Sequence, residues 1–568
     1  MHSGTRVVDH LVKAISRLGV RHVFGVDGAN IEDLYDAAFD HRELITAVVA
    51  KHEFSAATMA DGYARSTSGL GVVAATSGGG AVNLVAGLAE SFASRVPVLA
   101  LVGQPPTVLE GKGAFQDSSG RAGAFDAVRL FTPITRYCAR VGAPADLPAH
   151  LTRAVAAARA GGPAVLLLPK DVQQADLVAP PFTPPARGYR RDIEGLWRVL
   201  HAVRAARSTG KVVIVAGDQV ARDDARAQLA RVAAVLDAAV GVAPEAKDVY
   251  HHGDPGFCGV AGSMGHPELT DALHNAALCL LIGTRMPITA RAGLDEVLAH
   301  VSLASIGAAA PFLPSVHVRS TDLAITLAEL GTELARPATA SGASTWTPPT
   351  AADARRGRTL TAITVPPSDG PGLRYREVVE TINAALPDGA DVFADAGNTG
   401  AAVVHHLRLP RGGRFTVALG MGGMGYAFGA GIGSAFARAQ RRDGTPRRTF
   451  VIAGDGAFFM HGMEIHTAVE YRLPITFVVF NNNAHAMCIT REQLYYGDRY
   501  SFNRFRPAHP GAGMAAMFPD LCTHAPTTPA GLAAALRHCG HRGPSFIAVD
   551  CDPDEIPPFT PFLAASRS

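Results

Sequence analysis

The sequence predicts an α/β protein made of three doubly wound domains, each built on a parallel sheet. Short apolar runs such as HVFGV, GVVAAT, PVLALVG and PAVLLLP alternate with helical patterns along the first third of the chain, and this alternation is typical of parallel sheets. The chain has 568 residues, of which 48% are hydrophobic. That is enough apolar material to fill three cores of ordinary size.

Changes in composition predict the domain boundaries. Residues 1–185 form the first unit, which ends in the proline-rich stretch APPFTPPARG. Residues 190–335 form a second unit, whose clearest strands are KVVIVAG and LCLLIG. Residues 336–369 contain the most linker-like stretch, ARPATASGASTWTPPTAADARRG, and residues 370–568 form the third unit.

Charge and cysteine content exclude several classes of function. The formal net charge is +2, without a block of like charges suited to nucleic acid or a membrane surface, so we expect small-molecule partners. The seven cysteines form no CxxC pair, so neither a disulfide framework nor a zinc site is expected. The N-terminus lacks the apolar core of a signal peptide and no stretch reaches membrane-spanning length, so we expect a cytoplasmic protein.

Asp455 and Asn482 are the most informative pair of residues. They follow two runs, TFVIA and ITFVVF, that are predicted to be buried strands connected by a helix over residues 463–471. Because the carboxyl ends of parallel strands meet at one edge of the sheet, both side chains are expected to face the same ion. Such oxygen ligands suit Mg²⁺ or Ca²⁺, and the helix start after Gly456 offers free N–H groups to an anion.

This segment resembles the signature of the thiamin diphosphate-dependent enzymes, in which GDG is followed about two dozen residues later by NN. Here 24 residues, Ala457–Phe480, separate the two motifs. The resemblance implies thiamin diphosphate as the cofactor, with Mg²⁺ held by Asp455, Asn482 and the main-chain carbonyl of Ala484. On this segment alone, an ordinary turn and an ordinary strand end remain the alternative.

Several segments of the first third of the chain resemble the same family. In VVAKHEFSAATMADGYAR, the resemblance makes Glu53 the residue that hydrogen-bonds the aminopyrimidine ring and so activates the cofactor at C2; otherwise Glu53 is a solvated helix residue. The stretch TSGGGAVNLVAGLAESFASRVPVLALVGQPPT and then GAFQDSSG resemble acetolactate synthases. The GGG and the earlier FGVDGANIEDLY also resemble benzaldehyde lyase, which places the chain in the pyruvate oxidase and decarboxylase superfamily.

The motif GMGGMG, residues 420–425, has two interpretations. The resemblance places Met424 beneath the cofactor and the carbonyl of Gly422 on its amino group. The same letters fit the GxGxxG of dinucleotide-binding sites, which also requires a preceding strand and an acidic residue about 20 positions further on. There the chain has Asp443 in what resembles a polar loop, which disfavours the dinucleotide interpretation.

The resemblance implies a full set of site residues. Those expected to bind the cofactor are Glu53, Gly397, Asn398, Gly422, Met424, Gly454, Asp455, Gly456, Ala457, Asn482, Ala484, His485 and Met487. Those expected to line the substrate pocket are Ala29, Asn30, Phe115, Gln116, His485, Met487 and Cys488. Glu53 and Gln116 are the expected catalytic residues, Gln116 by orienting the reacting intermediate. His485 could equally be a solvent-facing loop histidine, and Asn30 a helix N-cap.

The side chains expected near C2 indicate the type of reaction. Simple decarboxylases of this family carry histidines that shuttle protons, whereas Thr76 stands at one such position here and Cys488 replaces a glutamate. A pocket poor in proton donors favours carbon–carbon ligation over aldehyde release. We therefore expect a carboligase that decarboxylates a 2-oxo acid such as pyruvate and adds the acyl unit to a second carbonyl compound. A non-decarboxylating acyloin lyase and a catalytically silent binding homologue are the alternatives.

The resemblance also predicts domain roles and assembly. It implies pyrimidine-binding, central and diphosphate-binding domains in that order, with the first and third alike in topology. Active sites are expected between the subunits of a homodimer or homotetramer. Arg285 in LLIGTRMPITARAG resembles an arginine of the FAD-binding members, but GTR is also an ordinary strand exit, so the sequence leaves FAD open.

Overall fold

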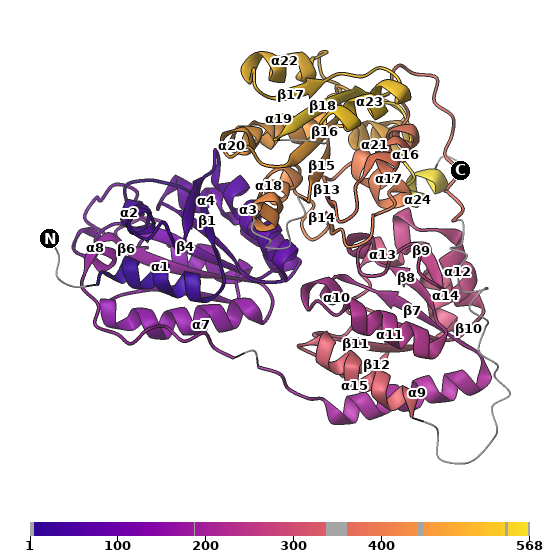
Figure 1. The fold of residues 1–568 in the computed structure, drawn as a ribbon, viewed down its shortest axis with the longest axis horizontal. Helices are drawn as coiled ribbons and strands as arrows, with labels where there is room; N and C mark the ends of the chain where they lie inside the picture. Colours follow the sequence, from indigo (N-terminus) through magenta and orange to yellow (C-terminus); the bar gives the residue numbers. More distant parts are fainter. Residues whose placement is uncertain (1–4, 187, 337–359, 440–446, 540–542, 566–568) are drawn as a thin grey trace.

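The computed structural model describes residues 5–186, 188–336, 360–439, 447–539 and 543–565. It contains three six-stranded sheets, all parallel and flanked by helices, which confirms the predicted α/β class with three doubly wound domains (Figure 1). Most of the predicted linker, residues 336–369, lies outside the described residues. None of the helices in the described ranges is both long and apolar enough to cross a membrane.

The first sheet has the strand order β2-β1-β3-β4-β6-β5. Its strands are β1 (His22–Val26), β2 (Thr46–Val49), β3 (Gly71–Ala75), β4 (Val98–Gln104), β5 (Tyr137–Arg140) and β6 (Pro163–Pro169). Its main helices are α1 (Val7–Arg17), α2 (Glu32–Asp40), α3 (Glu53–Thr67), α4 (Gly79–Asn83), α5 (Val85–Ala93), α6 (Ala127–Phe131), α7 (Leu147–Arg159) and α8 (Lys170–Gln174). The four strands that the apolar runs predict are present. The edge strands β2 and β5 are additional, because they are short and only partly buried and so carry no continuous apolar run.

The central sheet has the order β12-β11-β10-β7-β8-β9, which is the relative order of dinucleotide-binding doubly wound sheets. Its strands are β7 (Lys211–Ala216), β8 (Ala239–Val242), β9 (Phe257–Val260), β10 (Ala276–Ile282), β11 (Ser302–Gly307) and β12 (Val316–Arg319). Its helices are α9 (Ile193–Thr209), α10 (Asp218–Arg222), α11 (Arg226–Leu236), α12 (Pro267–His274), α13 (Ile288–Arg291), α14 (Asp295–His300) and α15 (Leu323–Ala335). The predicted strands KVVIVAG and LCLLIG correspond to β7 and β10.

The third sheet has the order β14-β13-β15-β16-β18-β17, which repeats the relative order of the first sheet. Its strands are β13 (Asp391–Ala394), β14 (Phe415–Val417), β15 (Thr449–Gly454), β16 (Ile475–Asn481), β17 (Cys522–His524) and β18 (Ser545–Asp550). Its helices are α16 (Tyr375–Ala385), α17 (Asn398–His406), α18 (Tyr426–Ala439), α19 (Asp455–His461), α20 (Ile465–Glu470), α21 (Ala486–Tyr496), α22 (Pro510–Met517), α23 (Pro529–Cys539) and α24 (Thr560–Ala565). The expected likeness of the first and third domains is therefore present.

The connection between β15 and β16 differs from the prediction of one helix over residues 463–471 that follows a turn at Gly456. Helix α19 begins at Asp455, directly after the strand, and a 3₁₀ turn at Gly462–Glu464 separates it from α20. The Asp455 carboxylate accepts a hydrogen bond from the Gly456 N–H (2.9 Å), which satisfies one of the free amides of the first turn. The helix therefore needs no loop before it.

Helix α3 of the first domain and helix α18 of the third domain pack side by side and form a contact between these two domains (Figure 1). A Cβ atom at Gly433 of α18 would lie 1.9 Å from the carbonyl oxygen of Met59 in α3. A Cβ atom at Gly62 of α3 would lie 2.0 Å from the carbonyl oxygen of Ala430 in α18. The two backbones are in direct contact, which only glycine allows at these positions.

A buried polar network crosses the same contact. The Asp61 carboxylate of α3 is fully buried and accepts hydrogen bonds from Arg65 Nε (2.6 Å), from Ser91 Oγ (2.7 Å) and from the hydroxyl of Tyr426 on α18. Each partner offsets part of the cost of burying the charge. The network also fixes how the two helices are aligned, because its members come from both.

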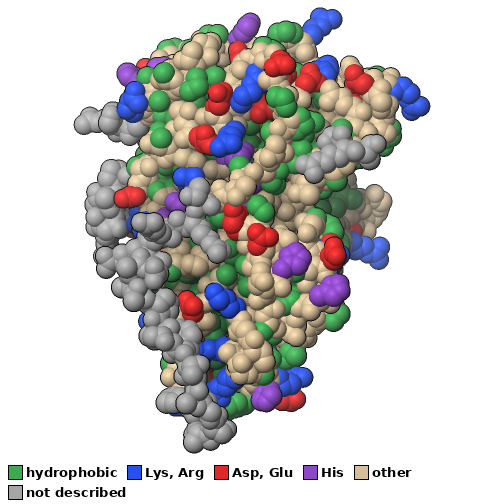
Figure 2. Space-filling model, turned by 90° about the vertical axis from the view of Figure 1, so that its right-hand side faces the viewer, with side chains coloured by type: hydrophobic (Ala, Val, Ile, Leu, Met, Phe, Trp, Pro, Cys, Tyr) green, Lys and Arg blue, Asp and Glu red, His purple; other side chains and the backbone are tan. Residues whose placement is uncertain are grey.

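Charges of both signs are interspersed on the face of the molecule shown in Figure 2, where neither the lysines and arginines nor the acidic residues gather in one large patch. The third domain and the central domain both contribute to this face.

Substituting Gly433 tests the helix contact. We expect Gly433→Ala to lower stability by about 1–3 kcal/mol, because the added methyl group forces α3 and α18 apart. Gly513→Ala is the matched control, since Gly513 lies in α22 with open space around it, and it should gain up to about 1 kcal/mol from helix propensity. Urea unfolding followed by circular dichroism measures both. Equal midpoints for the two variants would show that the close approach is unimportant.

Candidate active site

A cavity of about 350 Å³ lies at the carboxyl ends of the strands of the third sheet. This is the edge at which doubly wound sheets bind ligands. The cavity gathers every third-domain residue that the sequence singled out: Gly397, Asn398, Gly422, Met424, Gly454, Asp455, Gly456, Ala457, Asn482, Ala484, His485, Met487 and Cys488.

Asp455 and Asn482 come together because β15 and β16 are paired neighbours, with Gly454 opposite Phe480. The Asp455 carboxylate is 1% exposed and accepts hydrogen bonds from the backbone N–H groups of Gly456 (2.9 Å) and Ala484 (3.3 Å). Burial raises the pKa of Asp455 to about 6, against the opposing effect of these hydrogen bonds. A carboxylate in such a place is stabilised by a bound cation.

Asn482 lines the same cavity as Asp455 and has a side-chain oxygen without a hydrogen-bond partner among the described residues. Its Nδ2 donates to the Tyr375 hydroxyl (3.0 Å), which fixes the orientation of the amide. Its Oδ1 is buried without a hydrogen-bond partner in the described part of the chain, and so is the Oδ1 of Asn398. Buried oxygens without partners are rare, and a hard cation such as Mg²⁺ takes oxygen ligands of this kind. The donor set therefore fits the Mg²⁺ that the resemblance implies.

Two buried carboxylates hold the GMGGMG loop. Asp395, directly after β13, accepts from the N–H groups of Gly425 (2.9 Å) and Ala427 (2.9 Å), and burial raises its pKa to about 6. Glu90 of the first domain accepts from Gly420 N–H (3.2 Å) and Met421 N–H (2.6 Å). The loop is thus fixed at both ends, one of them by a different domain.

The fixed loop places Met424 against Gly456 across the cavity. A Cβ atom at Gly456 would lie 3.0 Å from the Met424 methyl carbon and 2.6 Å from Cδ2 of His485. Gly422 has a φ of +68°, which glycine adopts without strain. The absence of a side chain at Gly456 therefore allows Met424 and His485 to pack against the first turn of α19.

His485 lines the cavity. It is half-buried, directly precedes α21, and contacts the ring of Phe505 edge-on at a centroid distance of 4.7 Å. These contacts favour a pocket residue over the solvent-facing loop histidine that the sequence left open. Met487 and Cys488 follow it on the same wall.

Glu53 belongs to a second group of residues, at the carboxyl edge of the first sheet. It is the first residue of α3, is 9% exposed, and its Oε2 accepts from Asn83 Nδ2 (3.0 Å). Its Oε1 lies 3.0 Å from where a Cβ atom of Gly80 would be. The glycine-rich start of α4 thus leaves room for the carboxylate.

Asn30, Thr76 and Gln116 form a hydrogen-bonded chain beside Glu53. Asn30 N–H donates to Thr76 Oγ1 (3.2 Å), whose hydroxyl donates to Gln116 Oε1 (3.2 Å). Asn30 Nδ2 donates to Ser77 Oγ (2.7 Å), and the N-cap of α2 is Ile31. The alternative that Asn30 is a helix N-cap is therefore wrong, because its side chain ties two loops together.

The residues around Glu53 do not line the third-domain cavity. Among the described residues, the lining of that cavity comes from the third and central domains. Phe115 is 74% exposed, and Ala29 is exposed as well. The first-domain residues thus form a separate surface.

Arg285 lies in a different cavity, of about 270 Å³, at the carboxyl edge of the central sheet. Its guanidinium stacks on Phe312 at 4.0 Å from the ring centroid, and its Nε donates to the Ala310 carbonyl (3.2 Å). Arg285 is thus held in place at a ligand-binding edge.

Three family models match the chain in order. They are the thiamine pyrophosphate enzyme N-terminal TPP binding domain (residues 5–122), central domain (residues 199–310) and C-terminal TPP binding domain (residues 395–549). The chain belongs to the thiamine pyrophosphate enzymes. The N-terminal match contains Glu53 and Gln116, and the C-terminal match contains every lining residue of the candidate site except Met264, Thr289 and Phe559.

Individual relatives of this thiamine pyrophosphate enzyme are similar to it along most of its length. It is 28% identical over 517 residues to the "Probable acetolactate synthase large subunit" of Methanocaldococcus jannaschii, covering 86% of this chain and 82% of the relative. It is 29% identical over 513 residues to the acetolactate synthase large subunit of Parasynechococcus marenigrum, covering 86% and 78%. A solved structure described as a thiamin diphosphate-dependent enzyme from Mycobacterium smegmatis matches its fold with a TM-score of 0.78 at 21% identity, covering 96% of this chain and 99% of that one.

Sequence reasoning missed several residues of this thiamine pyrophosphate enzyme that hold the site residues in place. Asp395 carried a usable signal, because it follows the apolar strand DVFA just as Asp455 follows β15. Tyr375 and Glu90 carried none. Their partners, Asn482 and the loop at Gly420, are distant in sequence, and only the folded sheets bring them together.

Proposed function

We propose that this chain is a thiamin diphosphate- and Mg²⁺-dependent carboligase. It decarboxylates a 2-oxo acid such as pyruvate and transfers the acyl unit to a second carbonyl compound. The cavity that joins Asp455, the free oxygen of Asn482 and Met424 supports the cofactor and the metal. The similarity to acetolactate synthases over 86% of the chain supports the reaction.

In this proposal the third domain binds the diphosphate end. Asp455, the Asn482 oxygen and the Ala484 carbonyl hold Mg²⁺, and Met424 supports the cofactor's bent shape. When bound, thiamin diphosphate would supply the carbon nucleophile that this chemistry requires. Glu53 shares a proton with the aminopyrimidine ring nitrogen, and the restraint by Asn83 keeps its carboxylate in position.

The proposed substrate pocket is formed by side chains that are mostly uncharged. Thr76 and Gln116 hydrogen-bond each other, which leaves the Gln116 amide N–H free to orient a substrate oxygen. Met487 and Cys488 lie on the opposing wall. Because such groups deliver a proton poorly, the pocket favours attack on a second carbonyl over release of an aldehyde.

The proposed active site requires two chains. Within one chain, Glu53 and Gln116 do not reach the cavity that holds Asp455 and Asn482. We therefore propose a homodimer, or a homotetramer built from it, in which the first domain of one subunit covers the third-domain cavity of another. An isologous dimer of this kind has two equivalent sites.

The Arg285 cavity is the proposed location for FAD. The central sheet has the strand order of dinucleotide-binding domains, and the stacked Arg285 lies at its carboxyl edge. Flavin absorption bands in the purified protein would support this location, and a colourless protein that takes up no added FAD would exclude it.

Carboxyl-labelled pyruvate distinguishes the proposed reaction from its alternatives. We expect labelled carbon dioxide to be released, and the release to accelerate when an acceptor aldehyde or 2-oxo acid is added, with a product whose mass equals donor acyl unit plus acceptor. Cleavage or formation of acyloins without carbon dioxide would instead identify a benzaldehyde lyase-type enzyme. If neither occurs with cofactor bound, the chain is a silent homologue and the proposal is wrong.

Mixing two inactive variants tests the shared site. Glu53→Gln should nearly abolish turnover while cofactor binding is kept, and Asp455→Asn should weaken cofactor binding through the metal. After mixed refolding or coexpression, heterodimers contain one site with both substitutions and one with neither, so we expect activity to reappear. Glu43→Gln, an exposed change in the same domain, should leave activity unchanged. If the site lay within one chain, mixing would restore nothing.

A further inference from the structure

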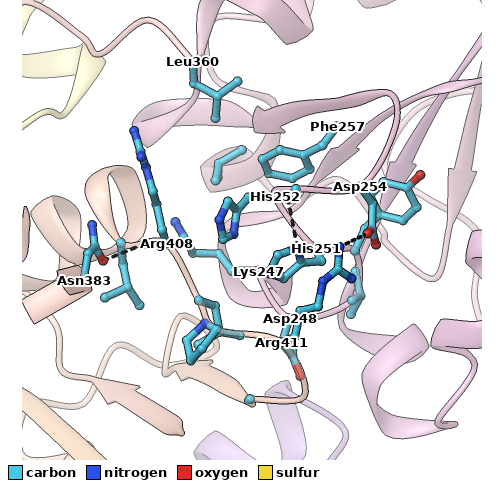
Figure 3. A pocket seen from close by; sticks show the side chains of 18 of the residues that line it. Lys247, Asp248, His251, His252, Asp254, Phe257, Leu360, Asn383, Arg408 and Arg411 are labelled. Atoms are coloured by element: carbon cyan, nitrogen blue, oxygen red, sulfur yellow. Dashed lines mark hydrogen bonds and ion pairs between the residues drawn. The ribbon is translucent and has the colours of Figure 1, made fainter. Parts of the chain in front are cut away.

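A second cavity, of about 930 Å³, lies between the central and third domains, away from the candidate active site. The central-domain segment 247–254 forms one wall, and residues 405–414, at and after the end of α17, form another. Figure 3 shows Lys247 and His252 between Arg408 and Arg411, with the Arg411 guanidinium beside His251 and Asp254. None of these residues has a role in the proposed reaction.

The lining of this cavity carries an excess of positive charge. Its basic residues are Arg226, Lys247, Arg376, Arg408, Arg411 and Arg414, and its acidic residues are Asp248, Asp254 and Glu380. Each acidic residue is already paired with a lining arginine: Asp248 with Arg226, Asp254 with Arg411 (2.6 Å) and Glu380 with Arg376 (2.8 Å). Arg414 also lies 3.9 Å from Asp248. The cavity's own carboxylates therefore leave Lys247 and Arg408 without a neutralising partner among the described residues.

Lys247 and Arg408 are the two lining cations without a carboxylate within ion-pair distance in the described ranges. The Lys247 ammonium donates only to the Val404 carbonyl near the end of α17, and burial lowers its pKa to about 7. A lysine is costly to bury without an anion. Arg408 is exposed, and Asn383 Oδ1 accepts a hydrogen bond from its backbone N–H, not from its guanidinium.

The histidines of the cavity add neutral donors. Burial, together with the neighbouring cations, lowers the pKa of His252 to about 4 and that of His406 to about 3, so both rings are uncharged near neutral pH. A neutral imidazole has one N–H donor and a flat face. The apolar side chains of Phe257 and Leu360 complete the wall.

We propose that this interdomain cavity binds a phosphate-bearing small molecule, with Lys247 and Arg408 as its charged contacts. Arginine and lysine are the residues that bind phosphate oxygens, and an ion pair in a partly enclosed cavity is stronger than one at the surface. The volume exceeds that of a phosphate group, so the histidine and apolar walls have room for an organic part. The site is separate from the diphosphate cavity and does not depend on the proposed reaction.

Calorimetric titration of the holoenzyme tests this site. The protein is first saturated with thiamin diphosphate and Mg²⁺, so that the diphosphate cavity is filled, and is then titrated with inorganic phosphate in one arm and adenosine monophosphate in the other. We expect binding in at least one arm; binding of the nucleotide alone assigns the organic part to the histidine wall. Lys247→Met and Arg408→Gln should each weaken binding about tenfold or more, in line with the loss of a charge-assisted hydrogen bond.

The control is Arg198→Gln, because Arg198 is an exposed arginine of α9 outside the cavity lining. It should leave the affinity unchanged. Lys247→Met keeps the side-chain length and removes only the buried charge, so it is expected to fold. Should neither probe bind, or should both lining variants bind as tightly as the wild type, the proposal is wrong.

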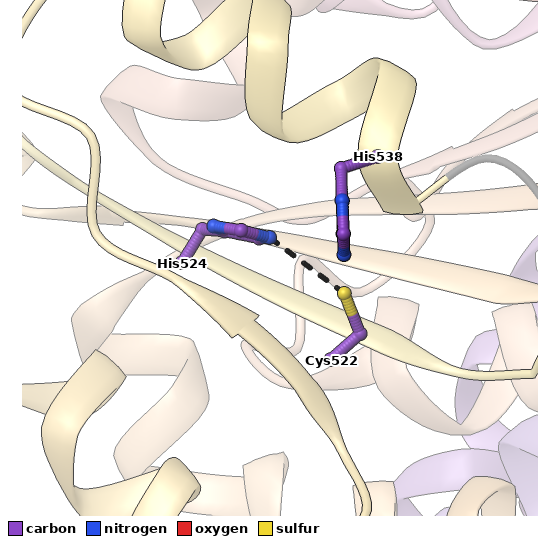
Figure 4. Close-up of side chains that lie close together, drawn as sticks. All are labelled: Cys522, His524 and His538. Carbon is purple, nitrogen blue, oxygen red and sulfur yellow. Dashed lines mark hydrogen bonds between the residues drawn. The ribbon is translucent and has the colours of Figure 1, made fainter.

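A cluster of thiol and imidazole groups at the edge of the third sheet supports an independent inference (Figure 4). Cys522 and His524 point to the same face of edge strand β17, two positions apart, and His538 comes from the last turn of α23. Their ligand atoms lie within 4.8 Å of one another, and Cys522 Sγ is 3.7 Å from His524 Nε2. With metal bonds of about 2.0–2.3 Å, the ligands of a tetrahedral zinc ion are separated by similar distances.

A neighbouring thiol contacts Cys522. The Cys539 sulfur lies 3.2 Å from that of Cys522, within hydrogen-bond distance for two sulfur atoms. An outer partner that hydrogen-bonds a ligand is a common feature of metal sites.

We infer that Cys522, His524 and His538 bind a thiophilic divalent cation such as Zn²⁺. Sulfur and imidazole nitrogen are its preferred ligands, and the exposed side of His538 leaves the fourth position to solvent. The CxxC pattern does not detect this arrangement, because its members come from a strand and from a helix that follows it. The expectation from the cysteine spacing that no zinc site is present is thus revised by this inference.

Metal analysis by mass spectrometry tests the cluster. Protein grown with added zinc and then dialysed should retain about one zinc per chain. Cys522→Ser and His538→Ala should each lose it, whereas His300→Ala, an exposed histidine of α14, should retain it. With cobalt in place of zinc, a thiolate charge-transfer band should appear and should vanish in Cys522→Ser. Wild-type protein without bound zinc, or with a disulfide between Cys522 and Cys539 in a non-reducing mass measurement, would overturn the inference.

Discussion

The direct backbone contact between α3 and α18 is the constraint on which the candidate site depends. Glu53 is the first residue of α3, and the GMGGMG loop leads directly into α18, so the contact determines where both begin. Gly62 and Gly433 allow the approach, and the Asp61 network fixes its alignment. Glu90 adds a direct bond from the first domain to the loop of the third. The packing of the first domain on the third therefore determines where Glu53 and the GMGGMG loop lie within each chain.

The first and third sheets use the same strand order and carry the two groups of candidate site residues. In both, these residues follow the strands at the carboxyl edge, which is where this topology exposes loops around a crevice. The third sheet places the Asp455 carboxylate and the Asn482 amide oxygen there, and the first places Glu53 beside a chain of neutral hydrogen bonds. One architecture thus provides both a charged and a largely neutral environment.

The interior of this fold could be predicted from the sequence, and its edges could not. Strands such as β4 and β16 are apolar runs because both faces are buried, whereas β2 and β5 lie at sheet edges and have mixed character. Motif spacing located Asp455 and Asn482, since strand ends determine their positions. Tyr375 and Glu90 could not be located, because a hydrogen bond between distant segments leaves no local pattern. The prediction of one helix over residues 463–471 missed α19, because a strand can lead directly into a helix without a turn.

Helix α17 touches two cavities at once. Its first residue, Asn398, lines the candidate active site, and its last residues, His405 and His406, line the interdomain cavity, where Lys247 bonds to the Val404 carbonyl. A nine-residue helix spans about 13 Å and moves as a stiff rod. A displacement of α17 along its axis would therefore change the wall of the candidate active site and the wall of the interdomain cavity together.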